Sequence, residues 1–311
     1  YASGTSTISF IIGGAGGVTM NAAGTLALSV ANTFTGGLRI NAGPVSGVDR
    51  QEHLTSASVI TLGARSGADN ATLNGALAGT FANPITVASG SSGTLSITNS
   101  AASQFSGAMT LQRDVVLAPT LTNLLTVRGG ITGTGNVIVS GTGTTAAVTM
   151  STVAINFSGT LTNQGTNTGT TTVSGGVGTN VTSITQSSTT SAMTISTTAL
   201  TVNGSGTTLT NTAGTRLLTL SGGVSGTGSL ILNNNSATAA AITVSTTSVN
   251  HTGTVTSSGT GSGTVVISAA LGANVTGVTQ NSATSALTLS GTNSPYAGTT
   301  SLSAGTLRLG S

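Results

Sequence analysis

Short runs along the chain alternate apolar residues with Thr or Ser, and glycine-rich stretches separate these runs. Examples are 25–30 (TLALSV), 136–140 (NVIVS) and 287–290 (LTLS). An alternation with a period of two, rich in β-branched residues and broken by Gly, predicts short β-strands that bury one face. No segment has a helical periodicity, and the helix-favouring residues Lys, Glu and Gln are scarce. We therefore expect an all-β protein.

An internal duplication indicates how the strands are arranged. Residues 147–196 align without a gap to residues 241–290, an offset of 94 (241 − 147), with 25 identities over 50 positions. Just upstream, 124–140 matches 217–233, so the duplicated blocks are 124–196 and 217–290. A fixed internal period is typical of stacked repeats, whereas a sandwich or an antiparallel barrel does not require one. The sequence therefore predicts a parallel β-helix (β-solenoid).

The expected β-solenoid is one elongated rod that runs through residues 1–311. With roughly 20 to 25 residues in each turn, the chain makes about a dozen turns, and a strand spacing of ~4.8 Å gives a rod on the order of 60 Å long. Uncapped strands at the ends of such a rod can pair with further strands. We expect the chain to be a fragment or subunit of a longer assembly, which either continues into further repeats or self-associates end to end.

A shorter motif recurs five times: two alternating apolar residues, then an aromatic residue or His, a small residue and Gly. The aromatic or His positions are Phe34, Phe105, Phe157, His251 and Tyr296. We expect these five side chains to share one repeat position and to form a stack inside the rod.

Two copies of this motif resemble a known repeat. LALSVANTFTGGLRINAG (26–43) and LTLSGTNSPYAGTTSLSAG (287–305) are similar to the passenger-associated β-strand repeat of bacterial autotransporter adhesins. The resemblance implies a right-handed parallel β-helix that is displayed on a bacterial cell surface or released from it, and therefore an extracellular location.

The composition excludes several classes of function. The chain contains 46 Gly, 64 Thr, 42 Ser and no Cys, and only 4% of its residues are charged, which is far below the usual quarter. All seven cations are Arg and are scattered along the chain, so no basic patch for nucleic acid is expected. The apolar run 8–12 is too short to span a membrane. A net charge of only +3 argues against disorder.

The residues that could carry chemistry are few. One charged cluster contains Asp49, Arg50, Glu52 and His53. Carboxylates beside a His allow general acid–base catalysis, but we interpret the cluster as part of a protruding loop, 48–70, which could also serve as an exposed binding loop. His251 has only His53 as a possible His partner, whereas a zinc site needs three or four ligands. We therefore expect no catalytic residue, no metal site and no cofactor.

Three functional classes follow, in order of preference. The first is a non-enzymatic extracellular structural protein: a bacterial surface fibre, filament subunit or adhesin stalk. The second is an adhesin module that binds carbohydrate or matrix through the loop 48–65, with surface glycans as partners. The third is a polysaccharide-active β-helix enzyme. Dense Thr runs such as 166–172 also allow a hydroxyl face that binds ice or sugars, provided that the hydroxyls of successive turns lie in register.

Overall fold

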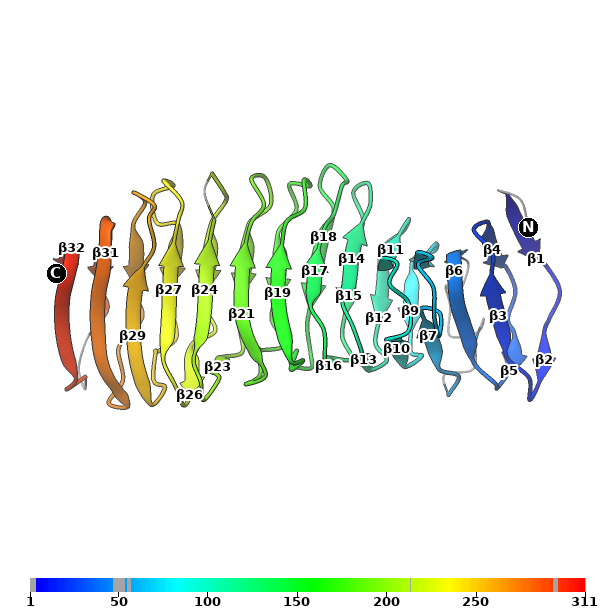
Figure 1. Cartoon of the computed structure of the whole chain (residues 1–311), viewed down its shortest axis with the longest axis horizontal. Coiled ribbons are helices and arrows are strands. Elements are labelled where there is room, and N and C mark those ends of the chain that lie inside the picture. Colours follow the sequence, from blue (N-terminus) through cyan, green and yellow to red (C-terminus); the bar gives the residue numbers. More distant parts are fainter. Residues whose placement is uncertain (1–3, 47–53, 55–56, 213, 293–295, 311) are drawn as a thin grey trace.

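The computed structural model describes residues 4–46, 54, 57–212, 214–292 and 296–310. Within these residues the chain is a parallel β-solenoid of about 13 turns and contains no helix. The turns stack along one long axis, and the two chain ends lie at opposite ends of the rod (Figure 1). These observations confirm the predicted fold class and the expected number of turns. The right-handed sense of the coil stays a prediction.

The strands form three columns, which we call the first, second and third face in the order in which each turn visits them. The first face contains β1 (Thr5–Ile8), β4 (Thr25–Leu28), the end of β6 (Leu38–Ser46), β8 (Ala71–Gly75), β11 (Leu95–Asn99), β14 (Val115–Pro119), β17 (Val137–Val139), β19 (Gly159–Asn163), β21 (Val181–Gln186), β24 (Thr207–Asn211), β27 (Leu230–Asn234), β29 (Gly253–Ser258) and the beginnings of β31 (Val275–Leu289) and β32 (Thr299–Leu309). The second face contains β2 (Gly13–Gly14), β5 (Thr33–Phe34), β9 (Gly79–Phe81), β12 (Ser103–Phe105), β15 (Leu124–Val127), β18 (Ala147–Met150), β20 (Thr171–Val173), β22 (Met193–Ile195), β25 (Leu218–Leu220), β28 (Ile242–Val244), β30 (Val265–Ile267) and the ends of β31 and β32. The third face contains β3 (Val18–Asn21), the beginning of β6, β7 (Ile60–Leu62), β10 (Ile85–Val87), β13 (Met109–Leu111), β16 (Ile131–Gly133), β23 (Leu200–Val202) and β26 (Val224–Gly226), with single bridges at Ile155, Val177, Val249 and Leu271.

The register explains the 94-residue period. On the second face, one column of paired residues contains Val148, Thr171, Met193, Leu218 and Ile242. The step from Val148 to Ile242 is 94 residues (242 − 148) and spans four turns. The duplicated segment is therefore a whole number of turns, so each residue of one copy lies on the same face as its counterpart in the other.

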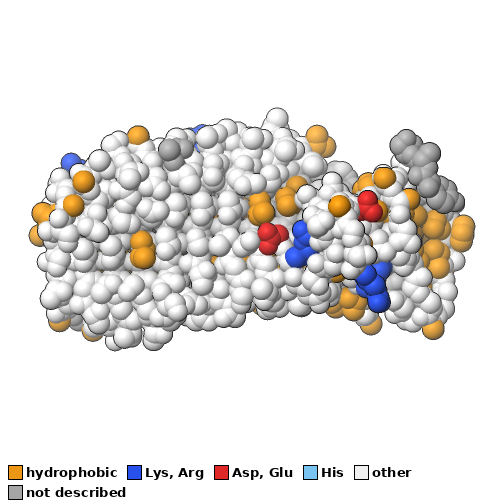
Figure 2. All heavy atoms as spheres, viewed as in Figure 1, with side chains coloured by type: hydrophobic (Ala, Val, Ile, Leu, Met, Phe, Trp, Pro, Cys, Tyr) orange, Lys and Arg blue, Asp and Glu red, His pale blue; other side chains and the backbone are white. Residues whose placement is uncertain are grey.

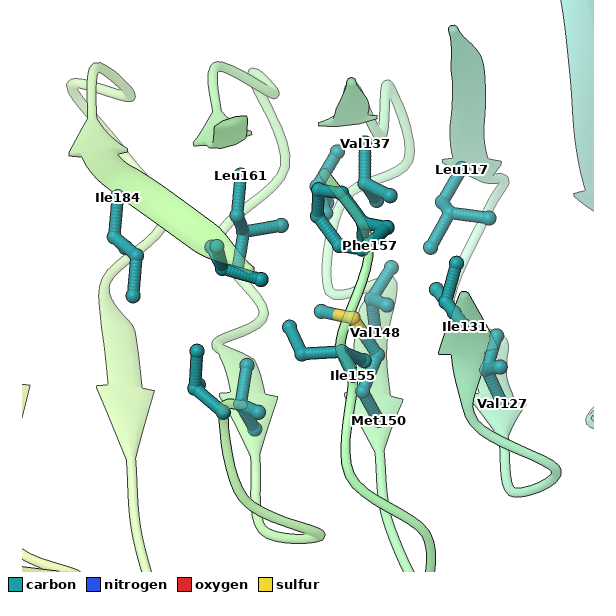
Figure 3. Packing of buried hydrophobic residues seen from close by; sticks show 14 of the residues in the cluster. Leu117, Val127, Ile131, Val137, Val148, Met150, Ile155, Phe157, Leu161 and Ile184 are labelled. Carbon is teal, nitrogen blue, oxygen red and sulfur yellow. The ribbon is translucent and has the colours of Figure 1, made fainter. Parts of the chain in front are cut away.

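The interior is filled by the apolar half of each alternating strand. Strands such as β17 and β24 alternate buried and half-buried residues, and the buried side chains of all three faces form one continuous cluster. Figure 3 shows Val137, Leu161 and Ile184 aligned along one wall of this interior, with Ile155 and Phe157 pointing inward from another segment. Each apolar side chain thus contacts its counterparts in the turns above and below, which is how a thin rod acquires a continuous core.

Close backbone contact at the corners explains some of the glycines. A Cβ atom on Gly107 would lie 2.0 Å from the carbonyl oxygen of Asn83, and one on Gly129 would lie 2.1 Å from that of Gly107. These residues follow the second-face strands, where successive turns approach too closely for a side chain. The glycine-rich stretches that delimit the strands in the sequence therefore include corners of the coil.

The predicted loop 48–70 contains a strand of the coil. Residues 60–62 form β7, which pairs with β6 on one side and with β10 on the other. The prediction of one protruding loop was therefore wrong for these residues. Their alternation, buried Ile60 and Leu62 around half-buried Thr61, is the same signal that identified the other strands.

Candidate functional surfaces

The second face carries two rows of hydroxyl groups. Its outward row has Thr at six successive turns, paired in register: Thr126, Thr149, Thr172, Thr194, Thr219 and Thr243. A parallel row two residues further along contains Ser151, Ser174, Ser196, Ser221, Ser245, Ser268 and Ser290, and each of these serines donates its backbone N–H to the preceding turn. Most of these side chains are half-buried, so their hydroxyls form a regular uncharged surface.

Shorter hydroxyl rows lie on the other two faces. Thr61, Thr86, Thr110 and Thr132 follow one another on the third face, and Thr162, Thr185 and Thr210 do so on the first. Of the dense run 166–172, only Thr172 belongs to a row, because 166–170 lie in the connection between β19 and β20. Figure 2 shows a surface on which uncharged polar side chains and backbone predominate. Such a surface can form hydrogen bonds through its hydroxyl and backbone groups.

The five motif residues do not form a single stack. Phe34 and Phe105 lie on the second face, where Phe105 pairs with Phe81 of the previous turn. The rings of Phe81 and Phe105 are stacked, with centroids 4.7 Å apart and planes inclined by 16°. Phe81 was missed by the sequence motif because Asn83 takes the place of the Gly that follows two residues later.

Phe157, His251 and Tyr296 occupy a different position, just before the first face. Each precedes by two residues a Gly (Gly159, Gly253 or Gly298) that leads into a first-face strand. The His251 Nε2 atom lies 3.2 Å from the carbonyl oxygen of Thr254, three positions further along the chain. In the same way, the Tyr296 hydroxyl donates to the carbonyl oxygen of Thr299 at 2.6 Å. The five motif side chains therefore occupy two positions of the repeat, and not the single position that we expected. The physical reason is that tight corners before and after the strands both need Gly, so the same short motif arises at both.

His251 is a polar side chain inside the core. It has no exposed surface, its Nε2 lies 3.2 Å from the Thr254 carbonyl oxygen, and its Nδ1 has no hydrogen-bond partner. Because a carbonyl only accepts, Nε2 carries the proton and the neutral ring leaves Nδ1 as a free acceptor. Burial lowers the pKa of His251 below its ordinary value of 6.5, and the bond to Thr254 opposes this to a lesser extent.

Buried amide side chains mark the corner after the first face. They are Asn99, Asn163, Gln186, Asn211, Asn234 and Gln280, and none has exposed surface. Asn211, for example, donates through Nδ2 to the carbonyl oxygens of Ala241 (2.6 Å) and Arg216 (3.0 Å). These amides donate hydrogen bonds to backbone carbonyls at the corner and so help to fix its shape.

The described charged side chains are scattered over the surface and do not converge. Arg65 and Asp69 are exposed, Asp114 accepts hydrogen bonds from the backbone and side chain of Asn136, and Arg128 donates to Gln104. The predicted binding-loop residues Asp49, Arg50, Glu52 and His53 lie outside the described residues.

Hollows in the described part of the chain have no cluster of ionisable groups. A hollow of about 560 Å³ at the N-terminal end is lined largely by the interior of the first turns, including Ile8, Met20 and Leu26. The described residues contain no group of three or more His, Cys, Asp or Glu side chains placed to hold a metal ion. Within the same residues, no helix has the length and apolar character needed to cross a membrane.

Two segments of the chain match a known family model, the passenger-associated transport repeat. The matched residues are 18–44, which cover β3 to β5 and most of β6, and 284–309, which cover the end of β31 and β32. With the β-solenoid fold, the two matches confirm the resemblance to an autotransporter passenger with β-strand repeats. No curated protein and no solved structure matches the chain.

Proposed function

We propose that this chain is a non-enzymatic extracellular rod that serves as a bacterial surface fibre, filament subunit or adhesin stalk. The observation that carries the proposal is the continuous stack of turns, with an apolar interior and an uncharged hydroxyl surface. The passenger-associated transport repeats support a secreted or surface location. In this function the chain supplies length and stiffness rather than chemistry.

The distribution of ionisable groups favours a structural role over catalysis. An active site brings together groups whose pKa values are shifted for the reaction. His251, whose pKa is lowered by burial, is sealed in the core and cannot reach a polysaccharide. The matched repeat is not known from an enzyme family.

The backbone ladders provide the mechanical basis of the proposed function. Parallel pairing joins each turn to the next on several faces, so that hydrogen bonds run along the rod axis. Force applied at one end is therefore distributed over several ladders and over the apolar columns between them. The low charge limits repulsion between the closely spaced turns.

We also propose that further strands cover both ends of the rod. In the described chain β1 pairs only with β4, and β32 only with β31. The side chains that face the core elsewhere are exposed on these end turns: Leu302 by 56% and Leu309 by 73%. Figure 2 shows hydrophobic side chains gathered at the N-terminal end and others at the C-terminal end. Either continuing repeats or a second copy can bury this surface.

The association state of the 311-residue chain shows whether a second copy or continuing repeats bury the apolar ends of the rod. If copies stack end to end, sedimentation velocity will detect dimers and longer species that increase with concentration, and electron microscopy will show straight rods of constant width. The double variant L302R/L309R is expected to remain a monomer, because it places charge on the open core. The matched control L77R alters an exposed leucine between β8 and β9, on the side of the rod, and is expected to associate like the wild type. A wild type that stays monomeric contradicts the second-copy alternative and leaves continuing repeats as the cover.

The function itself is tested by activity and binding assays on the folded rod. The structural proposal predicts no turnover of acidic or neutral polysaccharides and no saturable binding on a glycan array. Saturable glycan binding that is lost on deletion of residues 48–59, which spares β7, would instead favour the adhesin module. Release of reducing ends or unsaturated products from a polysaccharide would refute the non-enzymatic function.

A further inference from the structure

One short sequence recurs at a single corner of the coil. The tripeptide Asn-x-Ser/Thr is the acceptor sequence for N-linked glycans in secreted proteins, and the chain contains it seven times. The structure places six of the seven in the segments that connect the third face to the first: Asn70, Asn156, Asn180, Asn203, Asn250 and Asn274. The seventh, Asn234, is buried at the corner after the first face. The six acceptor tripeptides therefore follow one edge of the rod.

The conformation of these tripeptides turns both recognised groups outward. In five of the six, the middle residue is buried, whereas the Asn and the Ser or Thr are exposed or half-buried. The buried middle residues are Ala71, Phe157, Val181, His251 and Val275. The amide and the hydroxyl that define the acceptor sequence thus lie together on the outside of the coil.

Three of the asparagines are held in one orientation by the next turn. In each, Oδ1 accepts a backbone N–H at 2.7 to 3.1 Å: Asn70 from Thr94, Asn156 from Asn180, and Asn250 from Asn274. Within the described residues, Nδ2 of these three side chains forms no hydrogen bond. The oxygen of each amide is therefore anchored, and the nitrogen, which is the atom that N-glycosylation modifies, is free.

The same three asparagines are evenly spaced along the rod. They precede β8, β19 and β29, and four turns separate each of these strands from the next. With a strand spacing of ~4.8 Å, neighbouring sites lie on the order of 20 Å apart. This distance leaves room for a separate glycan at each site.

We propose that Asn70, Asn156 and Asn250 are N-glycosylation sites, modified by a transferase that uses a sugar activated as a phosphate ester. Nδ2 forms a bond to the anomeric carbon of the sugar while the bond from that carbon to the phosphate oxygen breaks. The phosphate leaves with the bonding electron pair, and the amide nitrogen gives one proton to a base of the transferase. Because Oδ1 is unchanged, its hydrogen bond to the next turn persists. The sugars add a bulky, hydrated layer to a surface with few charges.

Two asparagines of the same tripeptide serve as internal controls. Nδ2 of Asn203 donates to the Thr179 carbonyl oxygen at 2.6 Å, so a sugar on this atom would meet the backbone of the neighbouring turn. Asn234 has no exposed surface, and its Nδ2 donates to the Gly263 carbonyl oxygen at 2.7 Å. We expect both to be unmodified in the folded rod, although their tripeptides satisfy the acceptor sequence.

Glycopeptide mass spectrometry of the chain isolated from its own cells tests the proposal. The expected result is a sugar on Asn70, Asn156 and Asn250, with Asn203 and Asn234 unmodified. A single hexose at each site would identify a nucleotide-activated donor, and a larger preassembled oligosaccharide would identify a lipid-linked donor. Unmodified peptides at all three sites, or a sugar on the buried Asn234, would overturn the proposal.

A pair of variants separates modification from the structural role of the asparagines. S158A/T252A removes the hydroxyls of two acceptor tripeptides but keeps Asn156, Asn250 and their hydrogen bonds, and both substituted side chains are exposed. This variant is expected to lose the sugars on Asn156 and Asn250 and to keep the one on Asn70. The matched control S158T/T252S retains the hydroxyls and should carry all three. Sugars that persist on Asn156 and Asn250 in S158A/T252A would contradict the proposal. If that variant fails to fold, the wild-type glycopeptides still decide.

Discussion

Replacement of His251 by Phe is expected to remove a pH dependence from the stability of the rod. His251 is buried with its Nδ1 atom unpartnered, and burial lowers the pKa of the folded-state ring below 6.5. At high pH the ring is neutral in both states and contributes no pH dependence. As the pH falls through 6.5, the unfolded chain binds the proton first, so the free energy of unfolding decreases until the folded-state pKa is reached.

The size of this effect has an upper limit set by linkage. While the folded ring stays neutral and the unfolded ring is protonated, the free energy of unfolding falls by about 1.4 kcal/mol for each pH unit. Between about pH 7.5 and pH 5 the loss therefore reaches at most about 2 kcal/mol. No acid relieves the buried charge, because the described charged residues beyond position 129 are the exposed cations Arg216 and Arg308.

Urea unfolding followed by far-ultraviolet circular dichroism measures the effect at about pH 8 and pH 5. The wild type is expected to lose more stability than H251F on acidification, by up to about 2 kcal/mol. The reciprocal variant F157H places an imidazole at the same position of the first copy and is expected to lose more than the wild type. The other titratable groups are shared by all three proteins, so their contributions cancel in the differences. Equal losses in the wild type and H251F would refute the reasoning.

Three further substitutions test the core, the corners and the buried amides by urea unfolding. F105A removes one of two stacked rings and is expected to cost about 3–5 kcal/mol; a loss below 1 kcal/mol would contradict the packing. N211A removes the two hydrogen bonds that Asn211 Nδ2 donates to the carbonyls of Arg216 and Ala241 and should cost about 1–3 kcal/mol, whereas N233A, on the half-exposed side of the next turn, should cost under about 1 kcal/mol. G107A drives a Cβ against the backbone of the turn below and is expected to cost about 1–3 kcal/mol, whereas G204A meets no atom within 4 Å and should leave the urea midpoint almost unchanged.

The fold was predictable because its two determinants are visible in the sequence. Alternation of apolar and hydroxyl residues identifies the strands, and a duplication that spans whole turns identifies the parallel stack. The alternation predicts strands with outward hydroxyl residues, and Thr149, Thr172 and Thr194 are examples. Each is the outward residue at the centre of a three-residue strand segment, which reads apolar–Thr–apolar or Thr–Thr–apolar.

The two classes of corner could not be separated from the sequence. Phe105 is the last residue of a second-face strand, whereas Phe157 precedes a first-face strand. Both are followed two residues later by Gly, because both corners bring backbones together. Only the register between turns, which depends on the length of each connection, shows that the two rings belong to different columns.

The buried amides were also beyond prediction. A period-two pattern assigns residues such as Asn163 and Gln186 to the inside of their strands, but polar side chains are usually placed at the surface. Their inward position depends on carbonyls such as that of Ser191, which another part of the turn supplies. Such partners become apparent only when the chain is folded.

The equality between the 94-residue period and four turns of the second face bears on how the gene can change. Tandem copying or loss of that segment returns the backbone to the same angular phase, so both new junctions join strands that already fit each other. Rods of different lengths can therefore arise by recombination in one step, with the outline of the cross-section preserved. A copied segment that is not a whole number of turns would rotate everything downstream and expose its apolar side chains to water.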